Sequence, residues 1–470
     1  MANERNYIYY DHTISLCNEC HRKIDAKVIF QDEKVFMTKT CKEHGFQKVL
    51  LADDIEWYKQ IRNYNKASEY PLQPQTETKF GCPYDCGICP DHEQHSCLTL
   101  IEVTDRCNLT CPTCYASSSP THGRHRTLEE IKKMFEAVVA SEGEPDVVQL
   151  SGGEPTIHPQ FFEIMDMAKT YPIKHLMLNT NGLRIANDFA FAEKLATYMP
   201  DFEIYLQFDS FEAETLNQMR GKDLRNIREK AIANLNKLNL STTLVVTLQK
   251  GLNDHEIGKI IEYGLEQKCV RGVTFQPTQI SGRLDNFDPA TDRLTNSEVR
   301  RLIIEQSPVF EGNDLVPVPC NPDALVMAYA LKSKSGVFPL TRLIDPEMLL
   351  NNSRNTIVYE QDEALKGHLL EIFSTGISVD AVDEKVKHLL CCLPDIIAPG
   401  LSYNNLFRII IMNFMDAYDF DVRAIKKSCV HIVHTDGRII PFETMNMFYR
   451  PELQAHWAEL VGEMENERSS

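Results

Sequence analysis

Residues 98–279 alternate between two hydrophobic patterns, and this alternation restricts the fold of the chain more than any other feature. Short apolar runs with β character occur at 98–104, 146–155, 175–182, 202–210, 241–248 and 272–279. They are separated by segments with the helical period, at 128–140, 161–171, 188–199, 224–238 and 256–266. Strands that alternate with helices form a parallel sheet with right-handed crossovers. The predicted fold class is therefore α/β.

The cysteines are the second informative feature. The chain of 470 residues has 15 of them, and ten precede residue 115. The N-terminal stretch MANERNYIYYDH is polar and lacks the apolar core of a signal peptide. No apolar stretch approaches the roughly 18 residues that span a bilayer. We therefore expect a cytoplasmic protein whose cysteines are reduced and available as metal ligands.

The first cysteine group combines Cys17 and Cys20 with Cys41 and His44. Two such knuckles on either side of a hairpin-like stretch have the ligands and the spacing of a tetrahedral zinc or mononuclear iron site. The alternative is a set of unbound thiols. We expect a structural metal clip in a small domain over 1–75, which has too little core of its own.

The second group lies in GCPYDCGICPDHEQHSC and consists of Cys82, Cys86, Cys89 and Cys97. Its short gaps and its Cys-Pro step favour a fully ligated [4Fe-4S] cluster, although a zinc ribbon accepts similar spacing. We assign residues 76–100 to this auxiliary iron–sulfur segment. A fully ligated cluster can transfer an electron but cannot easily chelate a substrate.

The third group is Cys107, Cys111 and Cys114, spaced as C-x3-C-x2-C. It lies between the apolar run at 98–104 and a helical segment that begins near Thr127, which predicts a strand-to-helix loop. A [4Fe-4S] cluster held by three thiolates keeps one iron free for another ligand. The alternative is a structural site that takes a remote fourth ligand.

This third motif resembles the radical S-adenosylmethionine (radical SAM) superfamily, in which the free iron binds the amino and carboxylate groups of S-adenosylmethionine. The resemblance implies a partial (β/α)6 barrel over 101–288, whose strand ends line the cofactor pocket. It also implies that Cys107, Cys111 and Cys114 hold the catalytic cluster, which cleaves the cofactor to a 5'-deoxyadenosyl radical.

Polar residues at the carboxyl ends of the predicted strands agree with this resemblance. The segment Ser151–Pro155 reads SGGEP and is similar to the superfamily's GGE segment, whose glycines let backbone groups approach the methionyl ammonium. Arg220 is expected to pair with the cofactor carboxylate. The candidate cofactor-binding residues are Tyr115, Gly152, Gly153, Glu154, Asn181, Asp209, Arg220 and Gln276. Taken singly, such residues are equally typical of turns, helix caps or an exposed surface arginine.

The order of motifs along the chain resembles a narrower family. After the three cysteine groups come YLQFD, RGVTFQP, IMNFMDAYDFD and DGRIIPF, in the order of the archaeal tetraether lipid synthases and their bacterial relatives. Members of this group are also dihydropterin C-methylating enzymes. The resemblance implies carbon–carbon bond formation at an unactivated carbon, three [4Fe-4S] clusters and one rubredoxin-like iron.

Residues 289–470 are predicted to form a mainly helical domain for an auxiliary cluster and the substrate. Its candidate ligands are Cys320, Cys391, Cys392 and Cys429, although buried structural thiols are equally expected at Cys391 and Cys392. Relatives often have a cysteine shortly after DGRIIPF, where this chain has Glu443 and Thr444. The apolar run at 401–418 predicts a core helix or the lining of a lipid pocket.

The charge of the chain limits its partners. A formal net charge of −18 argues against nucleic acid and against electrostatic adhesion to anionic lipid. We expect a lipid or another small-molecule substrate, a low-potential electron donor such as ferredoxin or flavodoxin, and at most a transient membrane contact.

The sequence therefore predicts a radical SAM enzyme that forms carbon–carbon bonds, with the joining of lipid alkyl chains as the leading interpretation. The first alternative is a C-methyltransferase that acts on a dihydropterin. A non-catalytic iron–sulfur electron carrier would need neither GGEP nor an open cluster. A zinc-dependent binding module predicts zinc at every site and no iron.

Overall fold

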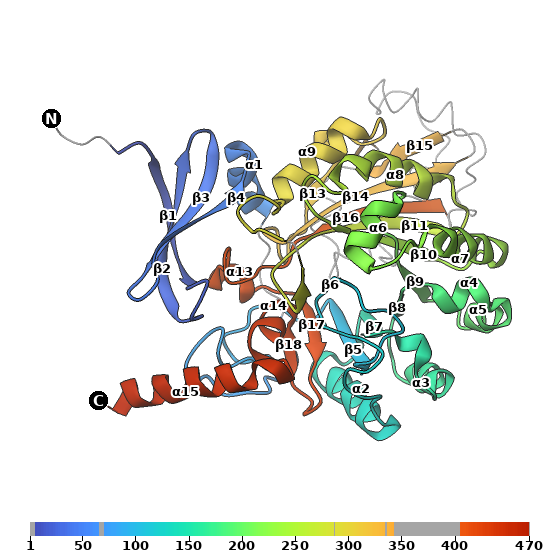
Figure 1. The fold of residues 1–470 in the computed structure, drawn as a ribbon, viewed down its shortest axis with the longest axis horizontal. Coiled ribbons are helices and arrows are strands. Elements are labelled where there is room, and N and C mark those ends of the chain that lie inside the picture. Colours follow the sequence, from blue (N-terminus) through green and yellow to red (C-terminus); the bar gives the residue numbers. More distant parts are fainter. Residues whose placement is uncertain (1–4, 65–69, 286, 334–335, 343–404, 470) are drawn as a thin grey trace, which may run out of the picture.

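The protein is built around one large sheet (Figure 1). The computed structural model describes residues 5–64, 70–285, 287–333, 336–342 and 405–469. The six strands expected from the apolar runs all form and lie side by side in chain order, every pair parallel. They are β5 (Leu98–Thr104), β7 (Val147–Gly152), β8 (His175–Thr180), β9 (Phe202–Gln207), β10 (Thr242–Leu248) and β11 (Val270–Pro277). The α/β class with a parallel sheet is confirmed.

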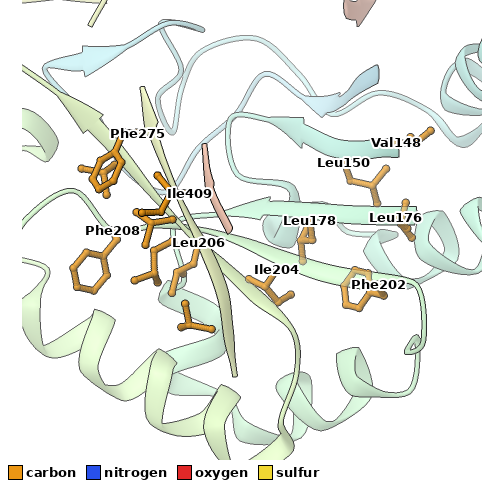
Figure 2. Close-up of a cluster of buried hydrophobic side chains, with 14 of the residues drawn as sticks. Val148, Leu150, Leu176, Leu178, Phe202, Ile204, Leu206, Phe208, Phe275 and Ile409 are labelled. Atoms are coloured by element: carbon orange, nitrogen blue, oxygen red, sulfur yellow. The ribbon is translucent and has the colours of Figure 1, made fainter. Parts of the chain in front are cut away.

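Helices connect these strands and cover the outer face of the sheet (Figure 1). They are α2 (Leu128–Glu142), α3 (Phe161–Ala168), α4 (Leu183–Asn187), α5 (Phe189–Ala196), α6 (Ala213–Arg220), α7 (Arg225–Leu238) and α8 (Ile257–Glu266). Figure 2 shows the core between the two layers, where buried side chains of neighbouring strands gather, such as Leu150, Leu178 and Leu206. Strands covered by helices need apolar residues in near-continuous runs, which is the pattern that predicted them.

The C-terminal part extends the same sheet at both edges. β16 (Leu406–Met412) pairs parallel with β11, and β17 (Val430–Val433) pairs parallel with β5. Antiparallel strands continue beyond each: β14 (Leu325–Ser333), β13 (Val316–Pro317) and β15 (Gly336–Pro339) at one edge, and β18 (Ile439–Pro441) at the other.

The prediction of a separate, mainly helical C-terminal domain is therefore wrong for the described residues. Within the run at 401–418, where a core helix was expected, residues Leu406–Met412 form strand β16 and residues 413–418 form a loop. The β-branched run Ile409–Ile411 is buried on both faces of the sheet, which favours the strand. The helices of this part are α9 (Asn296–Gln306), α13 (Val422–Ile425), α14 (Phe442–Thr444) and α15 (Gln454–Ser469).

The N-terminal part is a separate four-stranded antiparallel sheet, blue in Figure 1. Its strands β1 (Ile8–Leu16), β2 (Lys23–Gln31), β3 (Lys34–Cys41) and β4 (Gly45–Ala52) pair in chain order and precede α1 (Ile55–Gln60). Two further short strands, β6 (Thr113–Cys114) and β12 (Arg283–Leu284), pair with each other beside the barrel. In the part of the chain that the structure describes, no helix combines the length and the apolar character needed to cross a membrane.

Candidate active site and metal centres

A cavity lies at the carboxyl ends of the barrel strands, and the third cysteine group lines it. Cys107, Cys111 and Cys114 follow β5 on a loop. The same cavity is lined by most of the predicted cofactor-binding residues, namely Tyr115, Gly152, Gly153, Glu154, Asn181, Arg220 and Gln276. The structure thus brings together residues that are up to 169 positions apart, from Cys107 to Gln276. Asp209 is the one predicted residue of this set that does not line the cavity.

The two glycines of SGGEP are required by a close backbone contact. A Cβ atom on Gly152 would lie 2.1 Å from the carbonyl oxygen of Thr104, and one on Gly153 would lie 2.1 Å from that of Arg106. In the same contact the Gly153 amide donates to Thr104 O (2.8 Å) and the Glu154 amide donates to Arg106 O (2.9 Å). The end of β7 therefore holds the first part of the cysteine loop in place.

The carboxylate of Glu154 is hydrogen-bonded to neighbouring protein groups, although the residue lines the cavity. Its carboxylate accepts hydrogen bonds from Thr180 Oγ1 (2.7 Å), from the Asn181 amide (2.8 Å) and from the Thr156 amide (3.2 Å). Burial raises the pKa of this carboxyl group. Within the structure Glu154 is a positioning residue that connects the ends of β7 and β8.

Asp209 and Arg220 form a buried ion pair. Asp209 accepts hydrogen bonds from Arg220 Nη2 (2.6 Å) and Nε (2.8 Å), and from Arg228 Nη2 (2.9 Å). Burial opposes ionisation of Asp209, but the two guanidinium charges outweigh it and lower the pKa. Asp209 thus binds the Nε–Nη2 edge of the Arg220 guanidinium, while Nη1 donates to Thr113 O (3.3 Å). Arg220 also lies on the cavity wall, where it opposes the rise that burial causes in the pKa of Cys111.

The donor set of this loop fits an open iron–sulfur cluster. The three thiols border one cavity, yet their sulfur atoms do not all lie within 4.8 Å of one another, as the ligands of a single ion would. Burial raises the pKa of Cys107 to about 12, so its deprotonation must accompany metal binding. Cys107, Cys111 and Cys114 would hold three irons of a [4Fe-4S] cluster, whose fourth iron would remain open to another ligand.

Arg283 of β12 is a residue of this site that no sequence motif indicated. It pairs with Cys114 across the β6–β12 ladder and donates to the carbonyl oxygens of Cys111 and Ser118, the latter at 2.8 Å. Next to it, Gly282 adopts a positive φ of 59° and packs against the carbonyl oxygen of Tyr115. The segment after β11 thus holds the second part of the cysteine loop.

Side-chain amides form a second group in the cavity. Asn179 and Gln207 are polar residues at strand ends, where the sequence predicts contacts with the cofactor or substrate, whereas no sequence motif indicated Gln149. The cavity lining includes Gln149, Asn179 and Gln207 from three neighbouring strands. Gln207 Nε2 donates to Asn179 Oδ1 (3.0 Å), and Asn179 Nδ2 donates to Ser151 Oγ (3.2 Å). Gln149 is 3% exposed, and its Oε1 has no hydrogen-bond partner among the described residues. Asn179 and Gln207 lie in the second half of their apolar runs, whereas Gln149 lies inside its run without a distinguishing signal.

The N-terminal cysteine group assembles as predicted. The ligand atoms of Cys17, Cys20, Cys41 and His44 all lie within 4.8 Å of one another, at the β1–β2 and β3–β4 turns. His44 Nδ1 is 3.5 Å from both Cys17 Sγ and Cys41 Sγ. Three thiols and one imidazole at this spacing suit one tetrahedral ion.

The second cysteine group does not assemble as predicted. Cys82, Cys86 and Cys89 border a small cavity together with Pro441. Cys97 instead lies within 4.8 Å of the sulfur atoms of Cys320 and Cys429. The reason is sheet pairing, because Cys97 and Cys429 directly precede the parallel neighbours β5 and β17. Cys391 and Cys392 lie outside the described residues.

Comparisons with known proteins agree with this geometry. Residues 101–264 match the family model of the radical SAM superfamily, and residues 9–53 match that of the HMPTM N-terminal zinc ribbon domain. The chain is 32% identical to 7,8-dihydro-6-hydroxymethylpterin dimethyltransferase of Methanocaldococcus jannaschii, over 94% of each protein. It is 28% identical to GTP 3',8-cyclase of Pseudomonas fluorescens, over 45% of this chain and 63% of that protein. The crystal structure of Streptococcus suis SuiB bound to S-adenosylmethionine aligns with a TM-score of 0.35 at 15% identity, covering 44% of this chain and 46% of that one.

The superfamily match covers the cysteine loop and the SGGEP segment, and the zinc ribbon match covers the N-terminal ligand group. A radical SAM fold implies a [4Fe-4S] cluster and S-adenosylmethionine, which the residues around the cavity fit. The likeness to the archaeal dimethyltransferase extends over nearly all of both chains. This protein therefore belongs to the radical SAM superfamily and, within it, to the family of that archaeal enzyme.

Proposed function

We propose that this protein is a radical SAM C-methyltransferase that methylates a dihydropterin. The observation that carries the proposal is the 32% identity to the archaeal dihydropterin dimethyltransferase over 94% of both chains. The expectation of lipid alkyl chains as the substrate has no comparable support.

The lining of the cavity favours a polar heterocycle over an alkyl chain. Gln149, Asn179, Gln207 and Gln276 present amide groups to it, and the Gln149 Oε1 lacks a partner. A buried amide that faces hydrocarbon loses hydrogen bonds at a cost of about 1–3 kcal/mol. A ring N–H group of a dihydropterin would donate to Gln149 Oε1, whereas alkyl carbons cannot. Apolar lining residues such as Leu100 and Phe442 offer flat or aliphatic surfaces for the ring faces.

Different residues of the chain hold the cluster, orient the substrate and exclude water. When bound, the cluster and S-adenosylmethionine supply a radical able to act on an unactivated C–H bond. Cys107, Cys111 and Cys114 hold the cluster, while Gly152 and Gly153 set the position of their loop. The amides orient the substrate, and the buried walls of the cavity exclude water from the reaction.

The test is anaerobic turnover with dithionite, S-adenosylmethionine and 7,8-dihydro-6-hydroxymethylpterin, followed by mass spectrometry. We expect 5'-deoxyadenosine and methionine from the radical step, with electrons from dithionite, and a pterin that is heavier by one or two methyl groups. Each methyl group is taken from a further molecule of S-adenosylmethionine, which leaves as S-adenosylhomocysteine. Cys111→Ala should abolish both 5'-deoxyadenosine and the methylated pterin because it removes a cluster ligand. Cys269→Ala is the matched control, since this buried cysteine lies outside every candidate metal group.

The same assay with archaeal ether lipids as substrate separates the two interpretations. Coupled lipid chains without methylated pterin would overturn the proposal and restore the lipid interpretation. Loss of pterin binding in Gln149→Leu with retained uncoupled release of 5'-deoxyadenosine would agree with recognition of the substrate by the amide groups.

A further inference from the structure

A second tight ligand group lies at the opposite end of β5 from the radical loop. Cys97 precedes β5, Cys429 precedes the neighbouring strand β17, and Cys320 follows β13. The amide of Leu98 donates to the carbonyl oxygen of Cys429 (3.1 Å), which fixes the two strand starts side by side. Cys97 and Cys429 are buried, and Cys320 is partly buried. Three segments that are distant in sequence therefore converge on one set of thiols.

The spacing of these thiols suits a single ion rather than a cluster. Cys320 Sγ lies 3.6 Å from Cys429 Sγ. With Zn–S bonds of ~2.3 Å, tetrahedral geometry places two sulfur ligands roughly 3.8 Å apart. In the zinc ribbon of the same chain, Cys20 Sγ and Cys41 Sγ are 3.9 Å apart. A cubane binds each thiolate through a different iron, so its sulfur ligands lie farther apart, as they do among Cys107, Cys111 and Cys114.

His95 lies beside this thiol group and is the candidate for a fourth ligand. Its Nε2 atom is 3.5 Å from Cys97 Sγ, but it is not among the ligand atoms that all lie within 4.8 Å of one another, so the side chain must turn toward the other two thiols when an ion binds. Its Nδ1 atom is 3.0 Å from Glu142 Oε2, at the end of α2, and Glu142 Oε1 accepts from the Ser96 amide (3.1 Å). A carboxylate that accepts Nδ1–H leaves the Nε2 lone pair on the side of Cys97, which is the usual support of a metal-binding histidine.

Glu443 follows DGRIIPF, the stretch after which relatives often have a cysteine, and it is engaged elsewhere. Its Oε2 accepts from Ser428 Oγ (3.0 Å), and its carboxylate is not among the ligand atoms that lie within 4.8 Å of one another at this group.

We propose that Cys97, Cys320, Cys429 and His95 bind one tetrahedral metal ion of the zinc class. This centre replaces the iron–sulfur cluster expected in the C-terminal part from the cysteine pattern. Its role is structural: it joins the first barrel strand to the C-terminal strand β17 and to the segment that leads into β14. Because Leu98 and Val430 line the cavity, the ion also fixes the wall of the cavity at that end.

The test measures metal content and coordination in the full-length protein, purified anaerobically from cells supplied with zinc and iron. We expect two zinc ions per chain, one from the ribbon and one from this centre. Cys97→Ser should lose one zinc and leave the iron content unchanged.

The coordination of this centre is tested in the Cys41→Ser background, which removes the zinc of the ribbon. There, X-ray absorption at the zinc edge should show three sulfur ligands and one nitrogen ligand. His95→Gln should remove the nitrogen and speed zinc release to a chelator at least tenfold, whereas His158→Gln, a buried histidine of the barrel, should change neither.

Two outcomes would overturn the proposal. If Cys97→Ser removed iron and sulfide instead of zinc, the centre would be a cluster. If His95→Gln kept the nitrogen ligand, the fourth donor would be another residue. Glu142→Gln is a milder variant, because it keeps His95 and Ser96 in place but removes the carboxylate charge that supports His95. It should still speed zinc release. Metal content, X-ray absorption and zinc release do not depend on methyl transfer, so they test this proposal independently of the proposed function.

Discussion

At the scale of single residues, the active site depends on contacts that leave no room for a side chain. Gly152 and Gly153 lie against the carbonyl oxygens of Thr104 and Arg106, so the end of β7 and the cysteine loop are in direct backbone contact. The motif SGGEP is therefore a packing requirement of this loop. Only glycine fits such a contact.

Gly153→Ala tests this contact. The new Cβ would meet Arg106 O at 2.1 Å and must push the cysteine loop away. We expect the purified protein to hold less than half of the iron of the active-site cluster and to release little 5'-deoxyadenosine, while circular dichroism shows a folded chain. Gly462→Ala in α15 is the control, since a Cβ there meets nothing within 4 Å. Normal iron content in Gly153→Ala would show that the loop tolerates the shift.

Arg220→Lys tests the buried fork beneath the cluster loop. Lysine keeps the charge but cannot give the two parallel hydrogen bonds that Asp209 accepts from Arg220. We expect the free energy of unfolding to fall by about 1–3 kcal/mol, because a buried pair loses its geometry. Arg225→Lys, in the exposed pair with Asp223, is the matched control and should not change the thermal midpoint. Equal midpoints for both variants would contradict a structural role of the fork.

At the scale of elements, the added strands are tied to the barrel by buried charge. Arg408 of β16 donates to both carboxylate oxygens of Glu203 on β9 (2.7 Å each), across the intervening strands β10 and β11. Both side chains are almost fully buried. Burial alone would raise the pKa of Glu203, but the Arg408 charge outweighs it and lowers the pKa below its ordinary value.

Arg408→Met tests this ion pair, and the stability difference between wild type and variant should depend on pH. A carboxyl group whose pKa is lower in the folded state stabilises the fold above its unfolded pKa, near 4.5, and loses that contribution as the pH falls. Without Arg408, burial favours the protonated form, so ionisation at neutral pH destabilises the variant by about 3–5 kcal/mol. Thermal unfolding should therefore differ most between wild type and variant at pH 7 and converge toward pH 4. A difference that is constant with pH would assign the loss to packing alone.

At the scale of the whole molecule, the zinc ribbon docks on the C-terminal part through a few buried polar contacts. Lys39 Nζ donates to the carbonyl oxygens of Ala417 (2.6 Å) and Tyr418 (2.8 Å), and Thr13 Oγ1 donates to Asp421 Oδ1 (2.6 Å). The ribbon has its own small core, whereas the barrel core includes strand β16. The ribbon should therefore loosen without unfolding the barrel.

Lys39→Met tests the docking. The variant leaves two buried carbonyl groups without a donor, which costs about 1–3 kcal/mol at this interface. We expect faster amide exchange in β1–β4 and earlier proteolysis near their edges, with unchanged exchange in β7–β10. Lys27→Met, an exposed residue of β2, is the control. Faster exchange that spreads through the barrel would show that ribbon and barrel unfold as one unit.

Local patterns in the sequence were sufficient to predict much of the fold and part of the candidate site. The six barrel strands, their helices, the cysteine loop and the ribbon ligands were predicted because each depends on neighbouring residues: a run of buried side chains, a helical period, or ligands close together on one loop or at the ends of one hairpin. The helix predicted from the apolar run at 401–418 was wrong for Leu406–Met412, because a short buried strand and a buried helix have similar compositions.

Only the tertiary structure decided which distant residues meet. Cys97 belongs with Cys320 and Cys429 rather than with Cys82, because strand β17 returns from the end of the chain to pair with β5. Arg220 binds Asp209, and Arg283 supports the cysteine loop, through contacts that no spacing in the sequence encodes. The physical reason is that periodicity and motif spacing describe short-range geometry, whereas the partners of a strand edge or a buried charge are set by how the whole sheet closes.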